Sequence, residues 1–437
     1  MTPAEQELLT RVGPGTPMGL LLRRYWLPVA ASVDVSRGAT RGVRLLGEDL
    51  VLFRSPGGAL GLLEEHCPHR GTSLRYGAVG DAGLRCAYHG FLFDRGGRCL
   101  EIPGEAGEVA DAERAALRER LAARAYRAAE LGGLVFAYLG PEPAPLLPRW
   151  DLFVWDGALR DIGRALIDCN WLQIMENSVD PLHLEWLHGS QLHATTAREN
   201  PGGDGDGAPR RPEHYRKRHV RIGFDRFPYG IIKRRVLEGG TEDDDDWKVG
   251  HPLVFPLMLR VGADVQHRFQ IRVPVDDTHT LHFWYSCYRP AAGAAPVEPQ
   301  ERVPVYDVPW RDAAGNFIVD FIDGQDIMAW VTQGPIADRS REHLVSADRG
   351  IALYRRMLLE QIERVRSGED PVGVIRDPED NRIIELPQER NKYQGGAAFL
   401  AESVELGHAR YSPIKDRIRA LLLASAAASA GAAAPRG

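Results

Sequence analysis

The sequence predicts an α+β protein, with an all-β domain followed by a larger domain in which helices flank an antiparallel sheet. Short strand-like runs separated by turns fill residues 43–140. Beyond residue 149, strand-like runs follow one another without the regular alternation with helices that a parallel sheet requires. The proline-rich segment 141–148 is expected to be an extended linker, because prolines lack the N–H donors of a β-ladder.

Composition limits the classes of function to be considered. The chain has 437 residues, and 54 Lys and Arg against 60 Asp and Glu leave a net charge of −6. This balance argues against a general nucleic-acid binder. We see no run apolar enough to span a membrane, no secretion signal, and too few cysteines, five, for a disulfide framework. We therefore expect a cytoplasmic protein without a nucleic-acid or membrane partner.

The first domain is predicted to contain short strands and one inserted helix. Residues 1–42 are assigned to an N-terminal arm that packs on the second domain, and residues 43–140 to the all-β domain. Its expected strands cover residues 43–47, 49–53, 58–66, 91–102 and 134–140. In the fourth of these, Gly96 and Gly97 predict a tight hairpin turn with positive φ. The Ala-, Arg- and Glu-rich segment 110–129 predicts a helix.

The second domain is assigned to residues 149–423. A helix is expected at about 171–187 and a polar, Gly-rich loop at 200–212; expected strands include 219–224, 231–237, 267–275 and 280–286. Apolar residues at steps of three and four predict a later helix from Ile351 to Val365, which ends at Gly368. Residues 424–437 are expected to form a disordered tail.

The strongest chemical signal is a repeated pair of cysteine and histidine. Cys67 and His69 form a C-x-H pair, and after sixteen intervening residues Cys86 and His89 form a C-x-x-H pair. A structural zinc ion accepts the same ligands, but the first spacing is short for zinc. A glycine follows each pair and allows backbone amides to turn toward a negatively charged group. These features favour a [2Fe–2S] cluster with two thiolates on one iron and two imidazoles on the other.

The remaining cysteines and a neighbouring histidine are interpreted as structural. Cys99, Cys169 and Cys287 are expected to be buried free thiols. His66 precedes Cys67 directly, so on a strand its side chain points to the opposite face, and we do not expect it to be a ligand.

A second group of polar residues lies in an otherwise apolar helical segment. His183 and His188, with acids nearby, are the ingredients of a two-His-one-carboxylate iron(II) site with open positions for oxygen. On an ideal α-helix five residues separate side chains by about 140° of rotation, which is too far for one metal. We therefore predict that the helix unwinds, kinks or forms a wide turn between the two histidines.

Together these motifs resemble the α subunits of Rieske non-haem iron oxygenases. The resemblance extends from Arg11–Gly19 to about Asp370 and is greatest for the phthalate dioxygenase-type branch, which includes aromatic O-demethylases. It implies a Rieske domain and a helix-grip-like catalytic domain. It also implies a [2Fe–2S] cluster and a mononuclear Fe(II) as cofactors.

Carried over residue by residue, the resemblance assigns a role to each motif. Cys67, His69, Cys86 and His89 would hold the cluster, and His183 and His188 would bind the catalytic iron. Asp180 would link His183 to His89 of the partner subunit. Asp326 matches the distant third iron ligand best, with Asp323 and Asp338 as competitors. Asn177 would line the iron pocket, although a structural amide is an equal interpretation.

The resemblance also implies partners. We expect O2 and an aromatic, carboxylated substrate, and either monooxygenation with demethylation or dioxygenation. Arg210, Arg211, Lys233, Arg234 and Arg235 are candidates to contact a carboxylate. No glycine fingerprint for a dinucleotide follows a strand, which implies a separate NAD(P)H-dependent flavin and iron–sulfur reductase. Head-to-tail packing would give a homotrimer, or a hexamer of two trimers.

Two interpretations from other classes remain open. The chain could be an electron-transfer protein in which only the Rieske domain functions, and metal analysis near two rather than three irons per chain would support this. It could instead be a zinc-stabilised binding protein, which would be colourless after purification.

Overall fold

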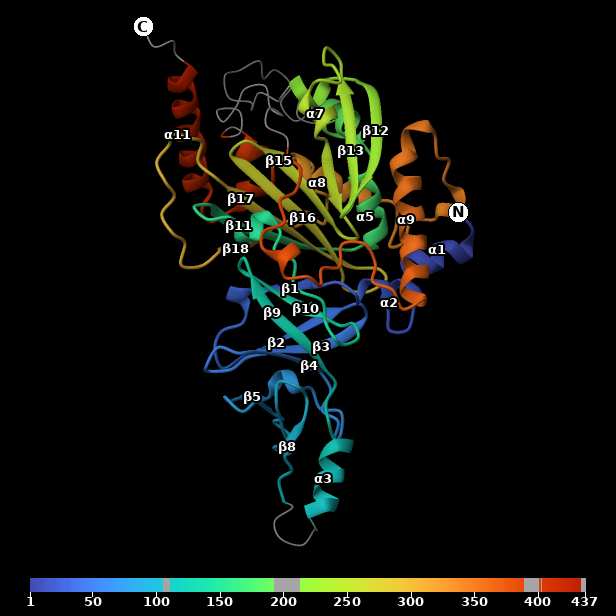
Figure 1. Ribbon diagram of the computed structural model, residues 1–437, viewed down its shortest axis with the longest axis vertical. Coiled ribbons are helices and arrows are strands. Elements are labelled where there is room, and N and C mark those ends of the chain that lie inside the picture. Colours follow the sequence, from blue (N-terminus) through green and yellow to red (C-terminus); the bar gives the residue numbers. More distant parts are fainter. Residues whose placement is uncertain (105–110, 192–212, 389–400, 402, 434–437) are drawn as a thin grey trace.

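The computed structural model describes residues 1–104, 111–191, 213–388, 401 and 403–433. Figure 1 shows an elongated molecule with two small sheets toward one end and a large sheet surrounded by helices at the other. The predicted α+β class is confirmed. Within the described residues no helix combines the length and the apolar character needed to cross a bilayer.

Two sheets form the N-terminal half. The six-stranded sheet has the order β1-β10-β9-β4-β3-β2 and is antiparallel throughout. Its strands are β1 (Leu27–Ala31), β2 (Ala39–Leu45), β3 (Glu48–Arg54), β4 (Leu60–Glu64), β9 (Ala125–Leu131) and β10 (Leu134–Tyr138). A four-stranded sheet continues beyond it, with β5 (Ala78–Val79), β6 (Leu84–Arg85), β7 (Leu92–Phe93) and β8 (Cys99–Glu101).

The eight-stranded sheet of the second half has the order β12-β13-β14-β15-β16-β17-β11-β18. Only the pairing of β11 with β18 is parallel among these described strands. Its strands are β11 (Leu159–Ile167), β12 (His219–Phe227), β13 (Gly230–Leu237), β14 (His251–Val254), β15 (Met258–Ala263), β16 (Gln266–Pro274), β17 (Thr280–Tyr288) and β18 (Val305–Asp307). The four strands predicted here are therefore confirmed as β12, β13, β16 and β17.

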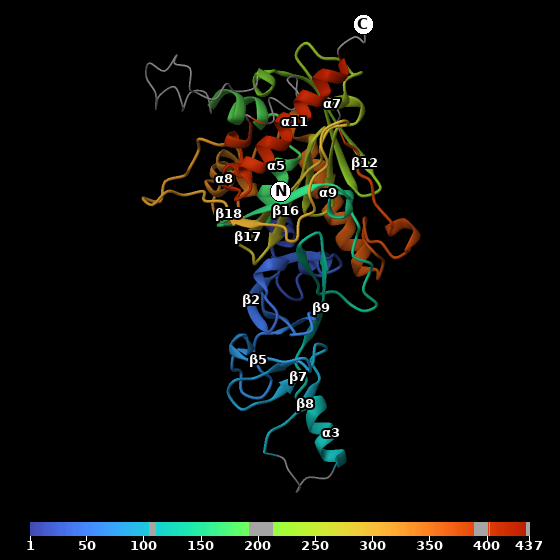
Figure 2. The same cartoon turned by 90° about the vertical axis from the view of Figure 1, so that its left-hand side faces the viewer.

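Helices pack around this sheet, as Figures 1 and 2 show. The principal ones are α1 (Pro3–Thr10), α2 (Pro17–Leu22), α5 (Trp171–Ser178), α8 (Ile322–Val331), α9 (Arg349–Arg366) and α11 (Lys415–Ala433); α4 (Asp151–Val154) and α7 (Asp245–Lys248) are single turns. Helix α9 confirms the helix predicted around 351–365. It has a clearly apolar face, and Tyr354, Leu358 and Ile362 are buried in the main core.

The N-terminal arm predicted over 1–42 contacts both halves. Helices α1 and α2 contact α9, and α1 also contacts α5. Strand β1 pairs with β10, and β2 pairs with β3, so the first sheet begins before the predicted boundary at residue 43. Thr2 and Thr16 cap the two helices through their side-chain oxygens, which explains why each helix starts at the following proline.

Two expectations about helices are corrected, and one about a loop is not tested. The helix predicted over 110–129 is shorter, α3 (Asp111–Arg120). Residues 125–129 belong to β9 instead, because pairing with β4 and β10 overrides the helix propensity of the alanines. The helix predicted over 171–187 ends at Ser178. The loop predicted at 200–212 lies outside the described residues.

The C-terminal tail expected to be disordered over 424–437 is helical as far as Ala433, and 434–437 lie outside the described residues. Alanine is the best helix former, and the helix is anchored by side chains that face the protein. Leu422 is fully buried, and the buried Ser425 hydroxyl accepts a hydrogen bond from the Ala291 backbone N–H at 3.1 Å.

Candidate metal centres

The two cysteine–histidine loops have the same backbone geometry. In the first, the Cys67 N–H donates to Thr72 O at 2.9 Å and the Gly71 N–H donates to Cys67 O at 2.9 Å. In the second, the Cys86 N–H donates to Phe91 O at 2.8 Å and the Gly90 N–H donates to Cys86 O at 3.0 Å. The two glycines have φ values of 74° and 77°, a region that favours glycine. Identical turns therefore present both pairs, although the histidine of the second lies one residue further on.

The four side chains separate into a buried pair and a more accessible pair. Cys67 and Cys86 are each 3% exposed and belong to a small apolar core. Burial, together with the nearby Cys86 thiol, raises the pKa of Cys67 to about 11. The His69 and His89 rings are partly exposed, with centroids 4.7 Å apart at an angle of 72°. Phe91 stacks on His69 at 4.4 Å.

This arrangement fits a two-metal cluster better than one zinc ion. The ligands of a single tetrahedral ion lie about 2.0–2.3 Å from it, so their donor atoms must be mutually close. Within the described residues, a set of three donor atoms all within 4.8 Å occurs at His183, His188 and Asp326 and not at the four Cys and His side chains. A [2Fe–2S] cluster places its thiolate and imidazole ligands on different irons and so matches the wider set.

The remaining cysteines and His66 occupy the structural positions that were expected. All five cysteines lack disulfides, and Cys99, Cys169 and Cys287 are buried. His66 is exposed, and its Nδ1 lies 3.0 Å from the carbonyl oxygen of Gly71, so its ring stabilises the first loop.

The backbone between α5 and His188 contains the wide turn predicted from the spacing of the histidines. Helix α5 starts at the Asn170 cap, whose side chain accepts from the Leu172 N–H at 3.0 Å, and ends at Ser178. After Pro181, a π-helix covers Leu184–Gln191. Because its hydrogen bonds join residues five apart, it brings residues with that spacing nearly into line, and His188 returns to the side of His183.

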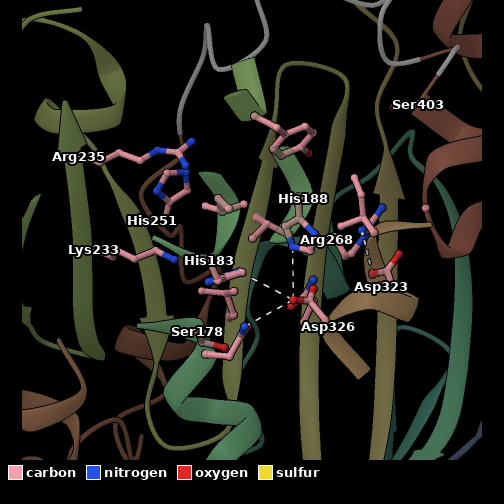
Figure 3. Close-up of a pocket in the computed structure, with 18 of the residues that line it drawn as sticks. Ser178, His183, His188, Lys233, Arg235, His251, Arg268, Asp323, Asp326 and Ser403 are labelled. Atoms are coloured by element: carbon pink, nitrogen blue, oxygen red, sulfur yellow. Dashed lines mark hydrogen bonds and ion pairs between the residues drawn. The ribbon is translucent and has the colours of Figure 1, made fainter. Parts of the chain in front are cut away.

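Three side chains from two segments far apart in the sequence meet at this point (Figure 3). Asp326 on α8 places Oδ1 3.3 Å from His188 Nε2 and 3.8 Å from His183 Nε2. The two imidazole centroids are 5.3 Å apart at 80°. Two imidazole nitrogens and one carboxylate oxygen therefore lie within 4.8 Å of one another. This is the ligand set of a mononuclear iron site that keeps open positions.

The two competing acids are engaged elsewhere. Asp323, one turn before Asp326 on α8, accepts from the His408 backbone N–H at 2.7 Å. Asp338 accepts from the backbone N–H of Ser340 at 3.1 Å, where it caps a short 3-10 helix. Neither carboxylate belongs to the three-residue cluster.

Neighbouring side chains orient the three converging groups. Gln325 Oε1 lies 3.0 Å from His188 Nδ1, while its Nε2 donates to Val319 O at 3.0 Å. This fixes the amide oxygen as the acceptor, so His188 carries its proton on Nδ1 and directs a lone pair on Nε2 toward the site. Gln325 was not anticipated, and its only sequence signal is its position beside Asp326. Asn177 Nδ2 lies 3.5 Å from Asp326 Oδ1, a long hydrogen bond.

Asp180 occupies the outer side of His183. Its Oδ2 is 3.5 Å from His183 Nδ1, and its Oδ1 accepts from the Leu182 N–H at 2.8 Å. Burial opposes ionisation, but the neighbouring His183 ring, the Leu182 N–H and Lys233 outweigh it and lower the pKa of Asp180. The carboxylate remains 27% exposed, and Trp186 nearby in the sequence is 66% exposed. Asp180 therefore joins the buried site to the molecular surface.

Helix α5 is held in place by a buried ion-pair network. Glu176 accepts from Arg339 Nη2 at 2.7 Å and from Arg355 Nε at 2.6 Å, and all three side chains are at most 10% exposed. Bidentate guanidinium–carboxylate pairs fix orientation as well as distance. The network therefore positions Asn177, the next residue, against Asp326.

A pocket opens beside the three converging side chains. Lys233, Arg235 and His251 lie on one side of it and Arg268, Asp323 and Ser403 on the other, with His183, His188 and Asp326 between them (Figure 3). Strand alternation decides which candidate cation lines the pocket. Lys233 and Arg235 face inward, whereas Arg234 between them points outward and its Nε pairs with Asp225. Arg210 and Arg211 lie outside the described residues.

Comparisons with known proteins agree with this geometry. Residues 25–116 match the Rieske [2Fe-2S] domain, and residues 137–296 and 311–387 match the LigXa C-terminal domain like family. The oxygenase subunit of 5,5'-dehydrodivanillate O-demethylase from Sphingobium sp. is 39% identical over 94% of this chain and 92% of its own. The phthalate 4,5-dioxygenase oxygenase subunit from Pseudomonas putida is 31% identical over 85% of this chain and 89% of its own. NdmA from Pseudomonas putida CBB5 shares the fold, with a TM-score of 0.56 at 20% identity over 80% and 94% of the two chains.

The fold and the two candidate ligand sets match those of a protein with two iron centres, one that transfers electrons and one that binds dioxygen. This chain belongs to the Rieske non-haem iron oxygenases, as an oxygenase subunit. It is an oxidoreductase whose cofactors are a Rieske [2Fe–2S] cluster and a mononuclear iron, and it works in a system with other components that supply electrons.

Proposed function

We propose that this subunit uses O2 and externally supplied electrons to hydroxylate or O-demethylate an aromatic carboxylate. The convergence of His183, His188 and Asp326 in a pocket with buried cations carries the proposal. Two similar proteins are named for O-demethylation of dehydrodivanillate and dioxygenation of phthalate, which supports an aromatic acid as substrate.

Lys233 and Arg235 are the proposed partners of the substrate carboxylate. Both line the pocket and are 4% and 2% exposed. Arg235 Nε pairs with Asp246 Oδ1 at 2.8 Å, and Asp246 also lies 3.8 Å from His251 Nε2. Lys233 and Arg235 therefore place two cationic side chains on this wall of the pocket. Charge-assisted hydrogen bonds to carboxylates are stronger than neutral ones, so this wall favours an anionic ligand.

The roles of the site residues follow from their geometry. Cys67, Cys86, His69 and His89 would hold the [2Fe–2S] cluster, and His183, His188 and Asp326 would hold the iron. When bound, the cluster supplies single electrons and the iron binds and activates dioxygen. Asp180 orients His183 through Nδ1, Gln325 orients His188, and Asn177 keeps Asp326 in place while bordering the substrate pocket.

We infer that the electron route crosses between subunits of a homotrimer, or of a hexamer of two trimers. In Figures 1 and 2 the four-stranded sheet, whose β6 and β7 flank the loop of Cys86 and His89, lies toward the opposite end of the molecule from α5 and α8, with the six-stranded sheet between them. The half-exposed Tyr88 lies on a cluster loop, while Asp180 is partly exposed near Trp186. Ring-closing head-to-tail contacts bring such different surfaces together. A separate NAD(P)H-dependent flavin and iron–sulfur reductase would reload the cluster in the cytoplasm.

Metal and product analysis test the proposed activity. The purified protein should contain close to three irons per chain and show the visible absorbance of an iron–sulfur protein. Turnover of methoxylated and carboxylated aromatics with a surrogate reductase should release formaldehyde for demethylation or a cis-diol for dioxygenation. Two irons per chain without turnover would favour an electron-transfer protein, and a colourless zinc protein would favour a binding function.

A mixing experiment tests the route between subunits. Cys86→Ser removes a proposed cluster ligand and Asp326→Ala a proposed iron ligand, so each variant alone should be inactive. Co-assembled in equal amounts, one contact in four should pair an intact cluster with an intact iron site, which predicts about a quarter of the wild-type activity. A mixed assembly without activity would place the route within one chain.

A further inference from the structure

The floor of the catalytic pocket changes character from one strand to the next. Lys233 on β13 lies opposite His251 on β14, and together with Arg235 they make one end basic. Leu259 and Val261 on β15 form an apolar stripe. On β16, Gln270 lies opposite Leu259 and Arg268 opposite Val261, and Gln266 follows on the same face. Because residues directly opposite in antiparallel strands share a face, these side chains form one continuous floor.

The β16 end is polar but carries no excess charge. Arg268 Nη1 is 3.9 Å from Asp323 Oδ1, so this carboxylate offsets the guanidinium. Asp323 also accepts from the backbone N–H of His408, and its Oδ2 lies 3.3 Å from His408 Nδ1. Burial and the charge of Arg268 lower the pKa of His408 to about 4, so this ring adds no charge. The two ends of the pocket therefore differ in electrostatics as well as in position.

Among the β16 residues that line the pocket, two buried side-chain atoms have no hydrogen-bond partner in the described part of the chain. One is Gln266 Oε1, which can only accept, and the other is Arg268 Nε, which can only donate. Buried polar atoms are nearly always paired, and both of these belong to side chains that line the pocket. A hydroxyl group satisfies both demands, because it donates and accepts. An ether or a carboxylate supplies acceptors alone and leaves Gln266 unpaired.

We propose that Gln266 and Arg268 form a second recognition site that binds a phenolic hydroxyl of the substrate. This rests on the proposed function, which places the carboxylate at Lys233 and Arg235. Strands β13 and β16 are three strand intervals apart, about 14 Å at 4.7–4.9 Å each. The substrate class is therefore a hydroxylated aromatic acid in which the hydroxyl and the carboxylate lie at opposite ends of the ring system, with the ring over Leu259 and Val261.

Ligand binding to the anaerobic holoenzyme, measured by isothermal titration calorimetry, tests this assignment. The probes are benzoate, 4-hydroxybenzoate and terephthalate, and the corresponding acids built on biphenyl, so that two ring lengths are covered. In at least one series the hydroxyl should tighten binding about tenfold over the unsubstituted acid, and the second carboxylate should not. Gln266→Leu should abolish the hydroxyl preference, while Gln266→Glu, which keeps an acceptor oxygen, should retain it. The exposed Gln333→Leu is the matched control.

The outcomes separate this proposal from the proposed function. If acids bind and Lys233→Met weakens them, but neither hydroxyl series gains affinity, only the recognition site at Gln266 and Arg268 is wrong. The same holds if Gln266→Leu leaves the hydroxyl preference intact, or if the dicarboxylates bind most tightly. If no acid binds although the enzyme turns over a neutral aromatic, the carboxylate assignment is wrong and the hydroxylated-acid class is wrong with it.

Discussion

At the scale of single residues, the proposed iron site includes groups that orient the histidines in addition to the three converging side chains. Asp180 and Gln325 each contact the imidazole nitrogen that faces away from the site. A partner on that nitrogen fixes the tautomer and raises the basicity of the ligand. The histidine pair and Asp180 were predicted from sequence, whereas Gln325 acquires its role only when α8 packs beside the π-helix.

Replacement of Asp180 by asparagine separates orientation from charge. Asp180→Asn should lower kcat at least 10-fold while the cluster and iron contents stay near wild type, because an uncharged amide supports the His183 Nδ1–H poorly. Turnover, iron content and visible absorbance, measured on one preparation, check this result. The exposed Asp312→Asn is the control. Unchanged turnover would show that Asp180 is a surface acid without a role in catalysis.

Lys233 and Arg234 are adjacent residues that point to opposite faces of β13. Lys233→Met should raise KM for a carboxylated aromatic about tenfold or more, because it removes a charged partner from a buried wall. Arg234→Met is the matched control, since Arg234 pairs with Asp225 outside the pocket. Steady-state kinetics with an acid and its methyl ester test the effect. An equal rise in KM for the acid and its ester, or for the Lys233→Met and Arg234→Met variants, would exclude charge recognition by Lys233.

At the scale of elements, the π-helix Leu184–Gln191 allows His183 and His188, five residues apart, to point to the same side. Sequence reasoning predicted a departure from the α-helix here, because the 140° offset leaves no other way for two histidines to meet. It could not show which departure occurs. Close packing contributes to the answer: a Cβ on Gly189 would lie 2.2 Å from Tyr215 O, so this helix passes against the Tyr215 backbone.

Gly189→Ala tests the importance of that contact. The added methyl forces the π-helix and the Tyr215 backbone apart, and the free energy of unfolding should fall by about 1–3 kcal/mol. Iron content should drop with it, because His188 moves with the helix. Gly13→Ala is the control, since nothing lies within 4 Å of the Cβ position there. Denaturant unfolding and metal analysis provide the readouts, and full iron content in a stable Gly189→Ala protein would contradict the expectation.

At the scale of the whole molecule, buried histidines make the stability of the folded protein sensitive to acid. Burial and the charge of Arg260 lower the pKa of His267 to about 3, and its Nε2 lies 2.9 Å from Asp264 O. Burial likewise lowers the pKa values of His219 and His408, each to about 4. In the unfolded chain the same side chains titrate near pH 6.5.

The sign of the pH effect follows from these values. Between pH 6.5 and about 3 the unfolded chain binds a proton at His267 that the folded chain does not, so stability falls as the pH falls, by about 1.4 kcal/mol per pH unit for each such histidine. Between pH 7 and pH 5, the free energy of unfolding of His267→Gln should therefore fall by about 1–2 kcal/mol less than that of the wild type. Urea unfolding at both values measures this difference, with the exposed His343→Gln as control. Parallel losses in wild type and His267→Gln would refute the assignment.

The fold class, the cysteine–histidine motif, the unusual histidine spacing and the amphipathic helix α9 could be recognised in the sequence, because each depends on local spacing or composition. Contacts between distant segments make residues 125–131 a strand and 415–433 a packed helix, and they turn Lys233 rather than Arg234 toward the pocket. They also bring Asp326 from α8 to the histidines and set Gln266 and Arg268 opposite the basic wall. The physical reason is that strand register and helix docking are determined by contacts between segments far apart in the chain, which local residue patterns do not encode.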